Sequence, residues 1–229
     1  MSHTAHPYAV RLGILRPWKS RWFNLREFSS LLKEDVLLRE FLEKRLHGML
    51  VDSIDIERSP AAINVIIRTA KPGLLIGRGG EGIEKLKTEI DSYLKQIRKK
   101  ARKSSLPSKI GLKLTVEEIK SPEQHAKVMV EVIAQDLEKR LPFRRVMKQT
   151  LGKIMASRNV LGAKIALAGR LDGAEMARFE WLKDGRMSLQ TFRADVDFAR
   201  GRAHLPYGDL GIKIWIYKGE VVGNKIAKN

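Results

Sequence analysis

The eight residues Ile76-Gly77-Arg78-Gly79-Gly80-Glu81-Gly82-Ile83 place four glycines between two isoleucines. Two predicted strands precede them, over residues 54–57 and 63–68, because apolar and polar residues alternate there. A helix is predicted to follow, since apolar residues recur at helical spacing; they are Ile83, Leu86, Ile90, Leu94 and Ile97. A third alternating strand covers residues 110–117. A glycine turn between helical segments, with two strands before it and one after, therefore decides the fold of the first half.

One interpretation of this turn is a dinucleotide site, because Gly77, Gly79 and Gly82 spell G-x-G-x-x-G. That fingerprint requires a strand that runs directly into the loop and an acidic residue about 20 positions later. Here Pro72-Gly73 separates the strand from the loop, and the later region is rich in Lys and Arg. Both departures argue against a dinucleotide.

The other interpretation is a G-x-x-G loop made of Gly77, Arg78, Gly79 and Gly80. With a helix predicted over residues 34–46, the order of elements resembles the type II KH fold, in which such a loop brings backbone close to single-stranded nucleic acid. Glycine suits this because a Cβ would hold phosphates away. Ile76 and Ile83 are expected to anchor the two helix ends. Bases are expected beside the strand at 110–115, whose edge would be lined by Lys109 and Lys113; a plain helix-breaking turn is the structural alternative.

The charge of the chain favours a polyanionic partner. Lys and Arg number 44 against 26 for Asp and Glu, which gives a formal net charge of +18. Such an excess attracts polyanions, of which nucleic acid is the first candidate and an anionic membrane surface the second. The chain has no cysteine, which excludes disulfides and thiolate chemistry. No apolar run approaches the roughly 18 residues of a bilayer span, and residues 1–10 have no signal-peptide pattern, so a cytosolic location is expected.

The second half is predicted to form two helices, at about 122–141 and 143–158, followed by strands at 163–168, 178–183, 191–199 and 211–217. Along 192–198 apolar and charged residues alternate, which predicts one buried and one charged sheet face. The chain is thus expected to be α+β, with an N-terminal arm at 1–33, a type II KH domain at 34–119 and, at 120–229, two helices on an antiparallel sheet. Residues 1–16 should be extended. Trp18 and Trp22 would either stack on bases or pack against a helix.

The second of these helices carries a basic face. Its apolar stripe is expected to consist of Phe143, Met147, Leu151 and Ile154. Arg144, Arg145 and Lys148 then cluster on the exposed side. Like charges so close are mildly unfavourable unless a polyanion neutralises them. We therefore predict an RNA-binding patch, against the alternative of a merely solubilising face.

Nothing in the sequence indicates catalysis. The five histidines are scattered without H-E-x-x-H spacing, and no G-x-x-x-x-G-K-[ST] loop occurs. Asp195 and Asp197 share a strand face with Arg193, which favours an ion-pair network over paired catalytic carboxylates. We expect no enzyme activity, no metal and no cofactor.

Long C-terminal motifs carry a family resemblance: residues 169–178, Glu180-Trp181, 191–197 and 211–220. Together with 6–14 and 18–23 near the start, they closely resemble the family of small-subunit ribosomal protein three, nearly end to end. The segment 91–108 looks longer and more basic than is typical there. It would be either a helix end that touches ribosomal RNA or a solvated charge run.

The resemblance implies a structural constituent of the small (30S) subunit in the cytoplasmic ribosome. It implies binding to rRNA in the lower part of the head and contacts with head proteins ten and fourteen. It also implies that mRNA is held where it enters the subunit, with Arg144, Arg145 and Lys148 assisting its unwinding. The alternative is a free-standing KH-type regulator of mRNA.

Overall fold

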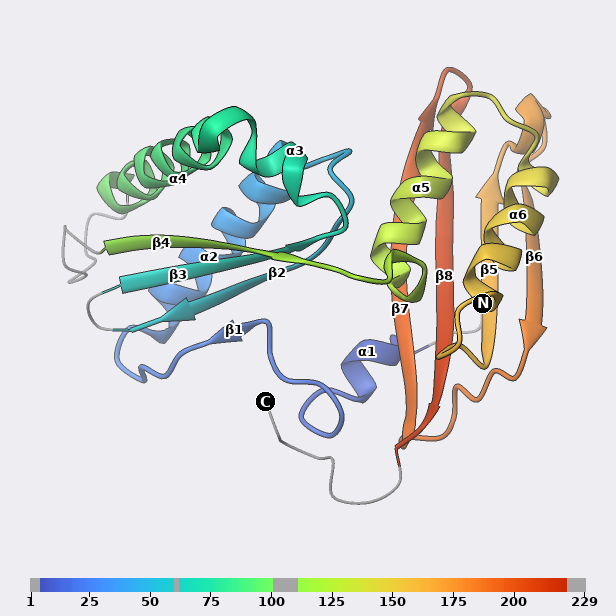
Figure 1. The fold of residues 1–229 in the computed structure, drawn as a ribbon, viewed down its shortest axis with the longest axis horizontal. Helices are drawn as coiled ribbons and strands as arrows, with labels where there is room; N and C mark the ends of the chain where they lie inside the picture. The colour runs from blue at the N-terminus through green and yellow to red at the C-terminus, as the bar shows by residue number, and fades with distance from the viewer. Residues whose placement is uncertain (1–4, 60–61, 101–110, 222–229) are drawn as a thin grey trace. The chain divides into compact units, whose positions relative to one another are not determined.

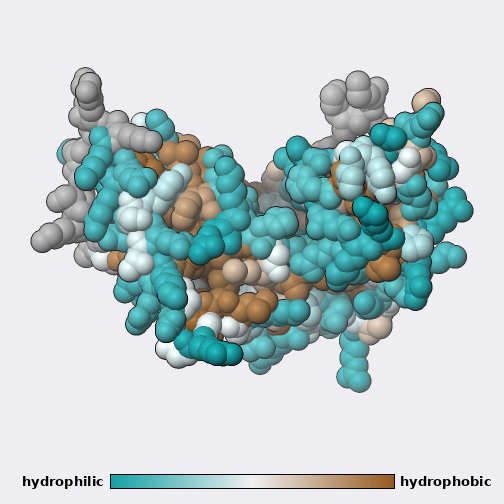
Figure 2. Space-filling model, turned by 90° about the horizontal axis from the view of Figure 1, so that it is seen from above, coloured by the Kyte–Doolittle hydropathy of each residue, from teal (hydrophilic) through white to brown (hydrophobic). Residues whose placement is uncertain are grey.

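The computed structural model describes residues 5–59, 62–100 and 111–221. The chain divides into two compact units (Figure 1). One is Lys19–Lys120, and the other joins Met1–Trp18 to Ser121–Asn229. No helix in the described ranges has the length and apolar character needed to cross a bilayer. Hydrophilic side chains cover most of the face seen in Figure 2, as the charge of the chain predicts.

The unit Lys19–Lys120 is a four-stranded sheet with helices on one face. Its elements are β1 (Ser20–Arg21), α2 (Phe28–Arg45), β2 (Val51–Arg58), β3 (Ala62–Thr69), α3 (Pro72–Ile76), a 3-10 turn (Arg78–Gly80), α4 (Glu81–Lys100) and β4 (Gly111–Glu118). The strand order is β1-β2-β3-β4. β2 and β3 are antiparallel, whereas β3 and β4 are parallel. Apart from β1, which was not predicted, this is the order of helices and strands expected from the sequence.

One face of this sheet forms a core with α2 and α4, because its strands alternate apolar and polar residues. The buried side chains come from α2, β2, β3 and α4, and they include Leu38, Leu42, Ile54, Ile56, Ile63, Val65, Ile67 and Ile90. The opposite face is polar, and its arginines form ion pairs with carboxylates on the same face. On it Arg21 pairs with Asp55 and Glu57, and Arg68 pairs with Asp55 and Glu117.

A buried ionic cluster ties α2 to β2 and α4. Arg58 pairs with Glu34 at 2.9 Å and with Asp35, and Arg98 pairs with Glu34 at 2.8 Å. The indole N–H of Trp22 donates to Asp35 at 2.7 Å. Trp22 therefore packs against a helix, the second of the two roles left open by the sequence, whereas Trp18 is largely exposed.

The other unit is a four-stranded antiparallel sheet covered on one face by two helices (Figure 1). Its elements are α1 (Pro7–Val10), a 3-10 turn (Pro122–Gln124), α5 (Ala126–Glu138), α6 (Phe143–Met155), β5 (Gly162–Gly169), a 3-10 turn (Leu171–Gly173), β6 (Arg178–Gly185), β7 (Ala194–Leu205) and β8 (Gly208–Glu220). The strand order is β6-β5-β8-β7. α5 and α6 bury residues such as Ile133, Met147 and Ile154 against Ile165, Leu167, Ile212 and Ile214 of the sheet.

The segment predicted as an arm, residues 1–33, is divided between the two units. Residues 28–33 form the start of α2, and residues 7–10 are helical rather than extended. Arg11 is only 1% exposed and donates to the carbonyls of Pro7, Leu189, Thr191 and Ala194. These contacts attach the first residues to the loop before β7.

The predicted pattern along residues 191–199 is partly wrong. The strand begins only at Ala194, because the Thr191 carbonyl accepts from Arg11 and from the Ala194 amide instead of entering a ladder. Phe192 is exposed, while Asp197 is buried. The carboxylate of Asp197 can be buried because it pairs with Arg16 and accepts from the Ala126 amide. Arg16, not Arg193, is the cation of this network.

Candidate nucleic-acid interface

The predicted loop is an exposed turn whose backbone requires glycine. Gly77 has φ 70° and ψ −174°, a region occupied almost only by glycine. Gly79 and Gly80 also have positive φ. Gly77, Arg78 and Gly79 are exposed, and Gly80 is half-buried. Three of the four residues of the turn therefore offer bare backbone to a ligand, and Arg78 adds an exposed cation.

The turn is held at its base by close contact between α3 and α4. A Cβ on Gly82 would lie 2.4 Å from the Leu75 carbonyl oxygen, so only glycine lets the helices meet there. Leu75 and Leu86 are the buried anchors. The expectation for Ile76 is wrong, because this residue is 37% exposed, and Ile83 is half-buried. α3 is a single turn, and the face it presents to the core is that of Leu75.

The structure places Lys113 on β4 but away from the loop helices. Its neighbours Leu112 and Leu114 pack against the core beneath α4, and side chains alternate along a strand. Lys113 is exposed and pairs in register with Asn64 on the polar face of the sheet. Lys109 lies outside the described residues, as do residues 101–108 of the basic segment. Residues 91–100 of that segment belong to α4.

The basic residues of α6 lie together on its exposed side. Phe143, Met147 and Ile154 are buried as predicted, Leu151 is half-buried, and Val146 and Thr150 complete the packed face. Arg144 lies 5.6 Å from the Phe143 ring centroid and 3.4 Å from a Glu180 carboxylate oxygen, yet remains 72% exposed. Arg145 and Lys148 are exposed and have no ion pair within the described part of the chain.

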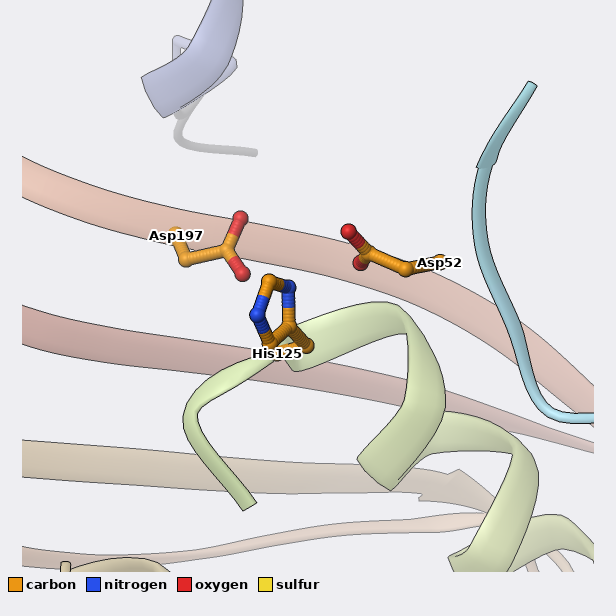
Figure 3. A group of neighbouring side chains, drawn as sticks. All are labelled: Asp52, His125 and Asp197. Carbon is orange, nitrogen blue, oxygen red and sulfur yellow. The ribbon is translucent and has the colours of Figure 1, made fainter. Parts of the chain in front are cut away.

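Two histidine–carboxylate pairs occur in the described part of the C-terminal unit: His204 contacts Asp209 at 2.7 Å on the surface, and His125 lies beside Asp197. His125 precedes α5, and Figure 3 shows its ring beside the Asp197 carboxylate of β7, with ligand atoms within 4.8 Å. Both Asp197 oxygens already have partners, Arg16 and the Ala126 amide. Asp52, also drawn there, belongs to the other unit. The contacts of His125 and Asp197 are those of a structural pair that stabilises the start of α5 against β7.

Two family models match the chain. Residues 37–124 match the KH domain, and residues 133–216 match "Ribosomal protein S3, C-terminal domain". The chain is 43% identical to small ribosomal subunit protein uS3 of Syntrophomonas wolfei, over 97% of this chain and 91% of the relative. It is 45% identical to uS3 of Endomicrobium trichonymphae, over 96% and 89%. For uS3 of Oleidesulfovibrio alaskensis the identity is 41%, over the whole of both chains.

The chain belongs to the uS3 family of small ribosomal subunit proteins. Membership confirms the predicted family, the α+β class with a KH domain, and the location on the ribosome. It also confirms that the chain is a structural component and not an enzyme. The uS3 relatives align with both units, whereas a free-standing KH regulator would align with only the first.

Proposed function

We propose that this uS3 chain binds rRNA in the lower part of the small-subunit head and holds mRNA where the message enters the subunit. Its α6 patch, Arg144, Arg145 and Lys148, would assist the unwinding of structured mRNA. The observation that carries this proposal is that the cations of the patch are exposed and mostly without carboxylate partners in the described ranges. Three exposed cations lie on a helix that is fixed by a buried apolar stripe, and two of them have no carboxylate partner in the described ranges.

The patch would act by electrostatics alone. Fixed cations lower the free energy of a single strand held against α6, because each phosphate contact releases counterions. A rigid helix adds little conformational cost when the strand binds. The work of opening a hairpin would come from translocation by the ribosome, while the patch would oppose re-pairing of the strands.

The KH loop is proposed to contact an RNA backbone through Gly77, Arg78, Gly79 and Gly80, supported by its exposed glycine backbone. Lys113 is proposed to contact phosphate from the polar face of β4, and Lys109 remains a proposal outside the described residues. Contacts with head proteins ten and fourteen are proposed on the strength of the family resemblance.

Replacing Arg144, Arg145 and Lys148 together by Ala tests the proposal. Ribosomes with this variant should translate a message with a stable hairpin several-fold more slowly than wild type. They should translate an unstructured message at nearly the wild-type rate. A translation time course on the two messages in parallel measures the difference.

A matched control removes three exposed cations of α2, Lys33, Lys44 and Arg45. It should leave the ratio of the two translation rates unchanged. Equal slowing of both messages by the α6 variant would contradict a role in unwinding. Failure of the variant to join small subunits would contradict the premise that the patch faces mRNA rather than the assembled head.

A further inference from the structure

The sheet face of the C-terminal unit that α5 and α6 leave uncovered has an unusual composition. Residues that alternate with the buried Ile165, Leu167, Ile212 and Ile214 point to this face. The strand registers align them in three rows across β7, β8, β5 and β6. The rows are Phe198-Trp215-Lys164-Lys183, Arg200-Lys213-Ala166-Trp181 and Arg202-Gly211-Ala168-Phe179. We call these twelve positions the aromatic-basic face.

Cations and aromatic rings occupy most of the aromatic-basic face, and no position in its three rows carries a carboxylate. Lys183, Arg200, Arg202 and Lys213 are exposed and have no ion pair within the described residues. Arg200 and Lys213 are direct cross-strand neighbours. Like charges placed opposite one another destabilise a sheet. A bound polyanion would relieve this repulsion.

Two aromatic rings of this face share one cation, Lys164. The ammonium of Lys164 lies 4.8 Å from the Trp181 ring centroid and 5.4 Å from that of Trp215, within cation–π range. Phe198 packs on Trp215 at 5.2 Å. Phe179 and Trp181 nevertheless remain 60% and 52% exposed. The face therefore presents two exposed rings, one of which is held by Lys164, together with four exposed cations.

The KH unit provides an internal comparison. Its sheet also leaves one face without helices, but there Arg21 and Arg68 are neutralised by Asp55, Glu57 and Glu117. That face contributes no ring comparable to Trp181, since its positions on β3 and β4 include Asn64, Arg68, Lys113 and Thr115. A polar sheet face in this protein is thus not basic by default. Within the described residues, the excess of unpaired cations and exposed rings is therefore specific to the aromatic-basic face.

We propose that the aromatic-basic face binds a single-stranded segment of RNA. Unpaired bases would stack on Phe179 and Trp181, and phosphates would contact Lys183, Lys213, Arg200 and Arg202. Four-stranded sheets with exposed aromatic rings bind single-stranded RNA in this way in RRM domains, and stacking on aromatics tolerates any base. The small residues Ala168 and Gly211, in the same row as Phe179, leave room for a base beside that ring.

This inference rests on the proposed RNA-binding function but concerns a separate surface. The test uses the full chain and a labelled single-stranded RNA of about ten nucleotides of mixed sequence, followed by fluorescence anisotropy. The background is the α6 variant R144A/R145A/K148A, so that the remaining affinity reports other surfaces. Replacing Phe179 and Trp181 by Ala should weaken binding at least about tenfold, since stacking contributes about 1–3 kcal/mol per base. It should leave the salt dependence unchanged.

Replacing Arg200 and Lys213 by Gln should instead lower the slope of log affinity against log salt by about one to one and a half. The matched control is F23A/F192A, which removes two other exposed rings that lie outside the face. Far-UV circular dichroism checks that each variant is folded.

Wild-type RNA affinity in the folded F179A/W181A variant would overturn the inference. So would a variant that binds RNA normally but no longer joins small subunits, because that result would assign the face to a protein partner. Failure of the α6 and KH proposals would look different. In that case R144A/R145A/K148A would leave RNA affinity and hairpin translation unchanged, while the aromatic-basic variants still lost binding.

Discussion

At the scale of single residues, the burial of an arginine decides how much its ion pair contributes to the stability of the fold. The Arg58 side chain is 6% exposed, and its partners Glu34 and Asp35 are more buried still. Arg45 makes a comparable fork with Glu89, at 2.9 Å, on the surface of the same unit. Losing one partner of a buried pair leaves an uncompensated charge, whereas an exposed pair is screened by water.

We predict that Arg58→Ala lowers the free energy of unfolding of the KH unit by about 3–5 kcal/mol. Arg45→Ala should lower it far less, because water screens the exposed pair. Hydrogen exchange of amides in β2, β3 and α4 measures both effects. Adding Glu34→Gln and Asp35→Asn to Arg58→Ala should restore part of the loss. Similar losses in the two single variants would show that burial does not set the strength of these pairs.

Arg16 shows the same principle in the C-terminal unit. Burial by itself would lower its pKa, but the carboxylates of Asp197 and Asp195 outweigh this and raise the pKa of the guanidinium. The two carboxylates therefore favour the charged form of Arg16. Asp195 and Asp197, which the sequence presents as a carboxylate pair, serve to hold the residues before Trp18.

At the scale of elements, the α3–α4 turn depends on backbone conformations that side chains avoid. Gly77 and Gly73 lie four residues apart and differ in this respect. Gly77 has positive φ and ψ near 180°, whereas Gly73 is an exposed helical residue with open space around its Cα.

We predict that Gly77→Ala destabilises the KH unit by about 1–3 kcal/mol, because an L-residue is strained in that region. It should also weaken RNA binding by the loop. Gly73→Ala should be neutral or slightly stabilising, since alanine favours the helix. Thermal unfolding and RNA binding of the two variants give the comparison. Loss of RNA affinity in Gly73→Ala without loss of stability would assign the contact to α3 instead of the turn.

At the scale of the whole molecule, the N-terminal residues belong to the same unit as the C-terminal half of the chain. Arg11 and Arg16 connect residues 7–16 to the loop before β7 and to its first residues. The chain consequently passes between the two units twice, near Trp18 and near Lys120.

Deleting residues 1–17 should therefore destabilise the C-terminal unit and not the KH unit. The carboxylates of Asp195 and Asp197 would lose Arg16, and the carbonyls of Leu189 and Thr191 would lose Arg11. Hydrogen exchange should speed up in residues 187–199 and stay unchanged in β3 and α4. Faster exchange confined to the KH unit would contradict this assignment of the N-terminal segment.

Local patterns in the sequence were sufficient to predict the helices and strands and two surfaces, the glycine turn and the basic side of α6. The glycine turn at 77–80 and the helical spacing of Phe143, Met147 and Ile154 depend only on residues close in the chain. For that reason the KH order and the exposure of Arg144, Arg145 and Lys148 could be predicted. The long motifs from Gly169 to Glu220 were sufficient to predict the family.

Only the tertiary structure decided which distant residues share a face. Period-two alternation does not say which strands are neighbours or which of two faces a helix covers. Lys113 was therefore expected at the edge of a groove between the loop helices and β4, but it lies on the opposite face of β4. Asp197 was expected on the surface but is buried. The aromatic-basic face exists because the order β6-β5-β8-β7 brings Trp181, Lys164, Trp215 and Phe198 together from four separate strands.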